Sequence, residues 1–172
     1  RDWSVTGVQT CALPISLAGV FSLEDALALV TARGKLMQQL PSGSMIAIAL
    51  PEEDVRSFLS NSLSVAAVNA PSMCTVSGPT DAIETLQKQL DDQEVDYRPL
   101  HTSHAFHSEM MEPMLASFTK RVQEVSRKPP QIPYISNVTG TWITSQEATS
   151  PEYWAAHRSE EHTSELQSLT NL

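Results

Sequence analysis

The chain has 172 residues, 41% of them hydrophobic, and a formal net charge of −9. That length allows one globular domain with a sizeable core, and the acidic charge argues against binding to nucleic acid or to an anionic membrane. No apolar run approaches the roughly 20 residues that cross a bilayer, so we expect a cytoplasmic protein. Two cysteines, Cys11 and Cys74, predict neither a disulfide nor a zinc site.

The two ends of the chain resemble translated DNA from a sequencing-library adapter. The string RSEEHTSELQS (Arg158–Ser168) can be encoded by DNA whose reverse complement translates as VTGVQTCALPI (Val5–Ile15). Chance does not readily supply that match, so we interpret residues 1–16 and 158–172 as non-native and residues 17–157 as genuine protein. The alternative is an ordinary N-terminal strand and a frayed C-terminal tail.

Residues 17–44 predict a helix. Ser22 and Asp25 resemble a capping box at its start. Apolar residues then recur at helical spacing and predict a core-facing stripe: Leu23, Ala26, Leu27, Val30, Met37 and Leu40. Gly34 costs about 1 kcal/mol relative to Ala inside a helix, which indicates that another group approaches closely there.

Residues 45–102 alternate between predicted strands and helices. Strands are expected at 45–50, 65–68, 74–77 and 95–100, and helices at 51–59 and 80–93. The order is strand, helix, strand, strand, helix, strand, which is that of a ferredoxin-like subdomain. The fold class is therefore α/β.

Residues 103–157 predict one more helix and one more strand. Apolar residues at helical spacing mark a helix that Pro113 can start and that Pro129 and Pro130 must end. A strand is expected at Ile132–Val138.

The densest group of polar residues is HTSHAFHS (His101–Ser108), between a predicted strand and a predicted helix. Loops at strand ends concentrate catalytic groups, so one of His101, His104 and His107 is a candidate general base. Composition alone does not choose among them. A zinc site would need all three rings to converge, which an extended chain disfavours. The remaining alternative is that these histidines are exposed or satisfied within the core.

Arg33 is the second candidate site residue, because it follows Val30 by three residues and Ala26 by seven on the predicted stripe. A guanidinium in that position needs an anion. One interpretation is a bidentate pair with a substrate carboxylate. The other is an intramolecular salt bridge, or an arginine whose stem lies along the surface.

Five ordered strings resemble the acyltransferase domains of type I polyketide synthases: LAGVFSLEDALALVTARGKLMQ, VAAVNAPSMCTVSGP, TSHAFHSEMMEPML, PYISNVTGTWIT and PEYWAAH. The resemblance covers residues 17–157. It implies a partial hydrolase-like α/β large domain, formed by 17–44 and 103–157, with an inserted ferredoxin-like subdomain at 45–102.

In that family a serine in a GHSxG motif attacks an acyl-CoA thioester, and the acyl group passes to the phosphopantetheine thiol of an acyl carrier protein. The resemblance implies that His107 is the base and that Arg33 binds the carboxylate of malonyl. It also implies that His104 and Phe106 shape the pocket, where a bulky Phe leaves no room for an α-methyl branch. HAFH is the form associated with malonyl rather than methylmalonyl units.

The resemblance further implies malonyl-CoA as substrate and no bound cofactor. The expected partners are an acyl carrier protein and the neighbouring ketosynthase and other synthase domains, with no nucleic acid and no membrane. No GxSxG occurs in the chain, so we expect a truncated domain that is inactive as it stands. Two alternatives stay open: a non-catalytic ferredoxin-like module that docks a carrier protein, and a transacylase of the fatty-acid-synthase type.

Overall fold

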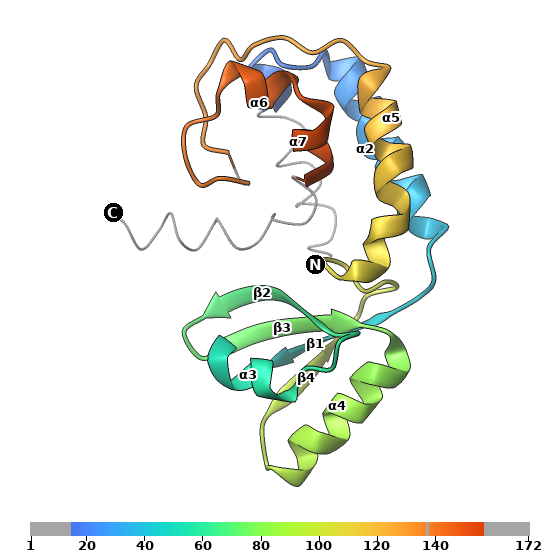
Figure 1. The fold of residues 1–172 in the computed structure, drawn as a ribbon, viewed down its shortest axis with the longest axis vertical. Helices are drawn as coiled ribbons and strands as arrows, with labels where there is room; N and C mark the ends of the chain where they lie inside the picture. Colours follow the sequence, from blue (N-terminus) through green and yellow to red (C-terminus); the bar gives the residue numbers. More distant parts are fainter. Residues whose placement is uncertain (1–14, 137, 157–172) are drawn as a thin grey trace. The chain divides into compact units, whose positions relative to one another are not determined.

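The computed structural model describes residues 15–136 and 138–156, which form two compact units (Figure 1). The first unit contains residues 15–38 and 114–156 and is helical, whereas the second contains residues 39–113 and holds the sheet. The fold is mixed α/β, as predicted. Apart from Ile15 and Ser16, the segments interpreted as adapter-derived lie outside the described residues.

The second unit contains a four-stranded sheet of order β2-β3-β1-β4, in which every neighbouring pair is antiparallel. Its strands are β1 (Ser44–Ile48), β2 (Ser64–Ala70), β3 (Met73–Gly78) and β4 (Tyr97–Leu100). Helix α3 (Glu52–Phe58) connects β1 to β2, and helix α4 (Thr80–Asp92) connects β3 to β4. Both helices lie on the same face of the sheet (Figure 1). This is the order of elements that the sequence predicts.

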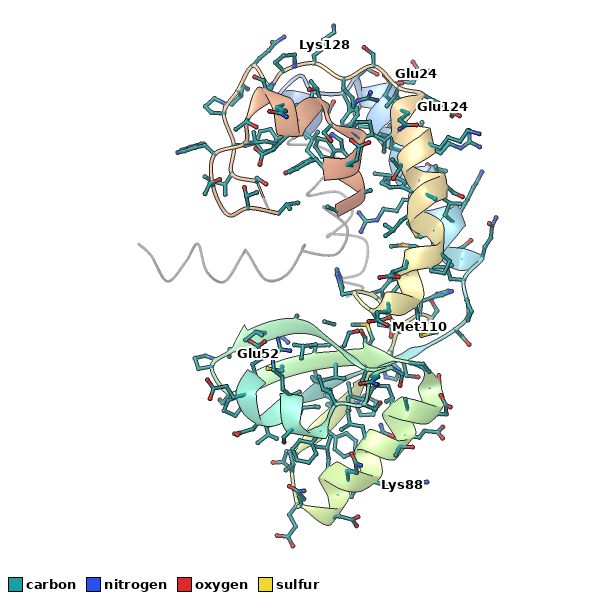
Figure 2. All side chains as sticks on the ribbon, in the orientation of Figure 1. Glu24, Glu52, Lys88, Met110, Glu124 and Lys128 are labelled. Atoms are coloured by element: carbon teal, nitrogen blue, oxygen red, sulfur yellow. The ribbon has the colours of Figure 1, made fainter. Side chains whose placement is uncertain are left out.

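The core of the second unit lies between the sheet and its two helices, where Figure 2 shows the side chains packed together and Lys88 on the outer side of α4. Alternate residues of β1 and β3, one face of each helix, and one residue just before β2 supply it: Ile46, Ile48, Val55, Leu63, Cys74, Val76, Ile83, Leu86 and Leu90. Burial raises the pKa of the Cys74 thiol, which therefore stays protonated and packs as a small apolar side chain.

The first unit is built from α2 (Leu23–Gln38), α5 (Leu115–Gln123), α6 (Ser145–Thr149) and α7 (Pro151–Ala156). Helices α2 and α5 lie side by side, and α7 packs against α5 (Figure 1). The ring centroids of Phe21 and Trp154 are 4.9 Å apart in an edge-to-face arrangement, which fixes α7 against the start of α2. The predicted cap is present, because the backbone N–H of Asp25 donates to Oγ of Ser22 over 3.0 Å.

Two expectations for α2 are wrong. Leu23 and Leu27 are 56% and 55% exposed, so the buried stripe is narrower than predicted and is formed by Ala26 and Leu29. A Cβ added to Gly34 would meet no atom within 4 Å, so no described group approaches this glycine closely. Periodicity located the helix correctly, but the width of its buried face depends on what packs against it.

Two further expectations change around α5. Pro113 lies inside a 3₁₀ helix (Glu109–Met114), and α5 begins only at Leu115. The strand predicted at Ile132–Val138 is absent from the described residues of that segment, where Ile135 alone forms a bridge, to Trp142. Proline lacks the N–H that a ladder needs, and here Pro133 lies within the predicted strand.

None of the helices within residues 15–136 and 138–156 is long and apolar enough to cross a bilayer.

Candidate active site

The HAFH loop follows β4 in the second unit, and its first histidine uses both ring nitrogens. Nε2 of His104 lies 3.2 Å from the carbonyl oxygen of Leu40, and Nδ1 lies 2.8 Å from Oγ of Ser103. A carbonyl oxygen only accepts, so Nε2 carries the hydrogen and donates it. In the neutral ring Nδ1 then accepts from the Ser103 hydroxyl. These contacts assign one tautomer to His104.

Ala105 is fully buried, and it packs against the segment that leads into β1. The N–H of Gly43 reaches the carbonyl of Ser103 at 3.5 Å. A Cβ on Gly43 would lie 2.6 Å from Cβ of Ala105, a distance that real Cβ atoms essentially never show. Only glycine fits there without a shift of the neighbouring chain.

His107 occupies a tight turn in a left-handed conformation, with φ of 60°. The turn is bracketed by two hydrogen bonds: the N–H of Phe106 donates to the carbonyl of His104 over 3.1 Å, and Oγ of Ser108 donates to the carbonyl of Ala105 over 2.7 Å. A non-glycine residue with positive φ is uncommon, although histidine is enriched in that class, and such residues cluster at functional sites. Nδ1 of His107 is buried.

Phe106 is half-buried between the two histidines. Its ring centroid lies 6.1 Å from that of His104, with the ring planes tilted by 43°. The structure thus brings three of the four predicted site residues, His104, Phe106 and His107, into one short loop. His101, four residues before Ala105, is exposed.

Arg33, the fourth predicted residue, lies on α2 in the other unit and is half-buried. It follows Leu29 by four residues and Ala26 by seven, so it lies on the buried face of the helix, as predicted.

In the described part of the chain, no three His, Cys, Asp or Glu side chains are grouped so that they could hold a metal ion. Two contacts of the loop were not predicted from the sequence. The contact between Ser103 and the ring of His104 has only a weak signal in the sequence, which is that the two residues are adjacent. The carbonyl of Leu40 has none, because it lies 64 residues away and every residue carries a carbonyl.

The sequence profile of the acyl transferase domain family matches residues 14–168. The chain belongs to the acyl transferase domain family. The match extends into residues 158–168, whose sequence resembles translated adapter DNA.

The relatives place the chain among the acyltransferase domains of type I polyketide synthases. Phenolphthiocerol synthesis polyketide synthase type I Pks15/1 of Mycobacterium marinum is 41% identical over 143 residues, or 82% of this chain and 7% of that protein. The acyl transferase domain of SpnD, solved with 2-(pent-4-yn-1-yl)malonyl, is 35% identical with a TM-score of 0.78, over 91% of this chain and 38% of that one.

A malonyl CoA-acyl carrier protein transacylase also has a similar structure. The malonyl CoA-acyl carrier protein transacylase of Burkholderia pseudomallei is 29% identical with a TM-score of 0.80, over 93% of this chain and 56% of that one. The chain spans less than a tenth of the length of the mycobacterial synthases that it matches.

Proposed function

We propose that the protein to which this acyltransferase sequence belongs moves a malonyl unit from malonyl-CoA to the phosphopantetheine thiol of an acyl carrier protein. The observation that carries the proposal is the HAFH loop. In this loop His107 has a left-handed backbone conformation, and two hydrogen bonds of the neighbouring residues bracket its turn. The similarity to a transacylase named for malonyl-CoA and acyl carrier protein supports the choice of donor and acceptor.

His107 is the general base in this proposal. It accepts the proton of a serine hydroxyl as the serine attacks the malonyl thioester, and it returns a proton to the departing thiolate of coenzyme A. In the second half His107 accepts the proton of the pantetheine thiol as its sulfur attacks the acyl-serine, and it returns that proton to the departing serine oxygen. We assign the transfer to Nε2, because Nδ1 is buried. The serine is expected from a GHSxG motif, and no GxSxG occurs in the 172 residues.

Arg33 and Phe106 would select the acyl group. A guanidinium on the buried face of α2 can pair with the free carboxylate of malonyl, which acetyl lacks. Such a charge-assisted pair contributes on the order of 1.5 to 3 kcal/mol. The half-buried ring of Phe106 would exclude the methyl branch of methylmalonyl, at about 1 to 3 kcal/mol.

We propose that the helical unit is part of a hydrolase-like large domain and that residues 45–102 form a ferredoxin-like subdomain inserted into it. The support is the element order and the sheet order β2-β3-β1-β4, together with the likeness to the SpnD domain. The partners of the acyltransferase domain would be an acyl carrier protein, and the ketosynthase and other domains of the same synthase. A fatty-acid-synthase-type transacylase is the second candidate, since it would use the same donor and acceptor that the Burkholderia transacylase is named for.

A chimera tests the proposed function. Residues 17–157 replace the matching segment of the SpnD acyltransferase domain, which supplies the rest of the domain. We expect the chimera to load an acyl carrier protein from malonyl-CoA about 10-fold or more faster than from methylmalonyl-CoA. A chimera that has the circular-dichroism spectrum and melting temperature of the parent domain, yet transfers no malonyl, would refute the proposal.

We also propose that residues 1–16 and 158–172 are adapter-derived, because the DNA encoding one end can be the complement of that encoding the other. The family match through residue 168 points the other way for 158–168. Resequencing the source DNA from primers inside 17–157 decides between them. Genomic DNA that encodes Val5–Ile15 and Arg158–Ser168 would show that both segments are native.

A further inference from the structure

We propose that His104 is a positioning residue, whose Nε2–H, donated to the Leu40 carbonyl, fixes the loop that carries His107. The inference rests on the proposed role of His107 as base. It replaces the pocket-shaping role that the family resemblance implies for His104.

The ring of His104 has polar partners at both nitrogens. Nε2 lies 3.2 Å from the Leu40 carbonyl and Nδ1 lies 2.8 Å from the Ser103 hydroxyl. Two opposed hydrogen bonds hold an imidazole ring in one orientation. A residue whose task is only to line an acyl pocket needs bulk and no such pair of partners.

The contact between His104 and Leu40 joins two segments that are far apart in the chain. Leu40 precedes β1, whereas His104 follows β4. The same segments meet again where Gly43 approaches Ala105 too closely for a Cβ, and where the N–H of Gly43 reaches the Ser103 carbonyl. Of these contacts, the His104 bond alone uses a polar side chain, so it is the one that a substitution can remove selectively.

His104 and Ala105, which these contacts fix, also accept the two hydrogen bonds that bracket His107. The carbonyl of His104 accepts from the N–H of Phe106, and the carbonyl of Ala105 accepts from Oγ of Ser108. The left-handed conformation of His107 is uncommon and persists only where its surroundings over-determine it. A shift of residues 104 and 105 would therefore misalign the imidazole of His107, and misplacements of about 1 Å are costly to catalysis.

Activity measurements on the SpnD chimera separate positioning from pocket shaping. His104→Phe keeps an aromatic ring but has no donor, whereas His104→Gln keeps an N–H donor near the Nε2 position. We expect His104→Phe to lower kcat about 10-fold with KM for malonyl-CoA and the malonyl preference unchanged, and His104→Gln to recover most of that loss. His101→Gln, at an exposed position of the same segment, is the control.

A pocket role predicts the reverse pattern. If His104→Phe keeps kcat and changes KM or the preference between malonyl and methylmalonyl, the positioning role is wrong. The same conclusion follows if Gln recovers nothing in a variant that melts at the temperature of the parent.

The tautomer provides a readout that does not depend on activity or on the folding of a variant. In the unsubstituted chimera with ¹⁵N-labelled histidine, we expect the His104 signals to report hydrogen on Nε2 and none on Nδ1. Hydrogen on Nδ1 with bare Nε2 would overturn the proposal. If His107→Ala keeps full activity, the proposed function fails, while the His104 tautomer still reports the Leu40 bond separately.

Discussion

The hydroxyl of Tyr153 donates a hydrogen bond of 2.9 Å to Oγ of Ser136, and both side chains are buried in the helical unit. The same Oγ accepts the backbone N–H groups of Val138 and Thr139, each at 3.2 Å. Burial raises the pKa of the Tyr153 hydroxyl, which therefore remains a donor at neutral pH. One serine oxygen thus ties α7 to the turn that follows Ile135.

Removing Oγ of Ser136 should lower the free energy of unfolding more than removing the hydroxyl of Tyr153. Ser136→Ala leaves two N–H groups and a buried hydroxyl without this acceptor, so we expect the free energy of unfolding to fall by about 2 kcal/mol. Tyr153→Phe removes one donor and should cost about 1 kcal/mol. Urea unfolding followed by circular dichroism measures both. Thr139→Ala, at an exposed hydroxyl in the same turn, is the control, and an equal effect of Ser136→Ala and Thr139→Ala would contradict this account.

Two glycines should respond to alanine in opposite directions. Gly43→Ala places a Cβ 2.6 Å from that of Ala105, and overpacking of this kind destabilises by about 1 to 3 kcal/mol. Gly34→Ala meets open space in the middle of α2 and should stabilise by about 0.5 to 1 kcal/mol. The melting temperatures of the two variants test this prediction, and each variant serves as the control for the other. A Gly43→Ala variant that melts no lower than the parent would refute the tight contact.

Arg33 should decide between malonyl and acetyl donors. In the SpnD chimera, Arg33→Gln removes the charge that pairs with the malonyl carboxylate, so the ratio of kcat/KM for malonyl-CoA over acetyl-CoA should fall about 10- to 100-fold. Lys35→Gln removes an exposed charge from the same helix and should leave the ratio unchanged. If Arg33→Gln lowers kcat/KM equally for malonyl-CoA and acetyl-CoA, the arginine has a structural role instead.

The 172-residue chain by itself should form no acyl-enzyme, because it contains no GxSxG serine. Intact-protein mass spectrometry after incubation with malonyl-CoA should show only the unmodified mass. The SpnD chimera, treated in the same way, is the positive control. A malonyl adduct on a serine of the 172-residue chain would show that the nucleophile had been misassigned.

The sequence predicted the second unit well because local patterns determine its elements. The apolar run at 45–50, the two strands around the turn before Met73, and the helix at 80–93 all have a clear period, and the structure has them within a few residues. The strand predicted at Ile132–Val138 failed, since a strand also needs a partner to pair with. The predicted burial of Leu23 and Leu27 was wrong for a related reason, because burial depends on neighbouring elements.

The candidate site was predictable only in part. His101, His104 and His107 were named as candidates from HTSHAFHS, because histidines in a loop at a strand end are a local signal. The choice of His107 and the naming of Phe106 came only from the family resemblance. The conformation of His107 was not predictable, since a positive φ at a non-glycine residue is imposed by surrounding contacts.

The most direct test of the central claim is the rate of malonyl transfer by the SpnD chimera with His107→Ala, compared with His101→Ala. Both remove a histidine from the same segment, but only His107 is proposed as the base. We predict that His107→Ala lowers kcat by about 10²- to 10⁴-fold and that His101→Ala leaves it within about 2-fold. Unchanged transfer by the His107→Ala chimera would contradict the central claim that His107 is the base.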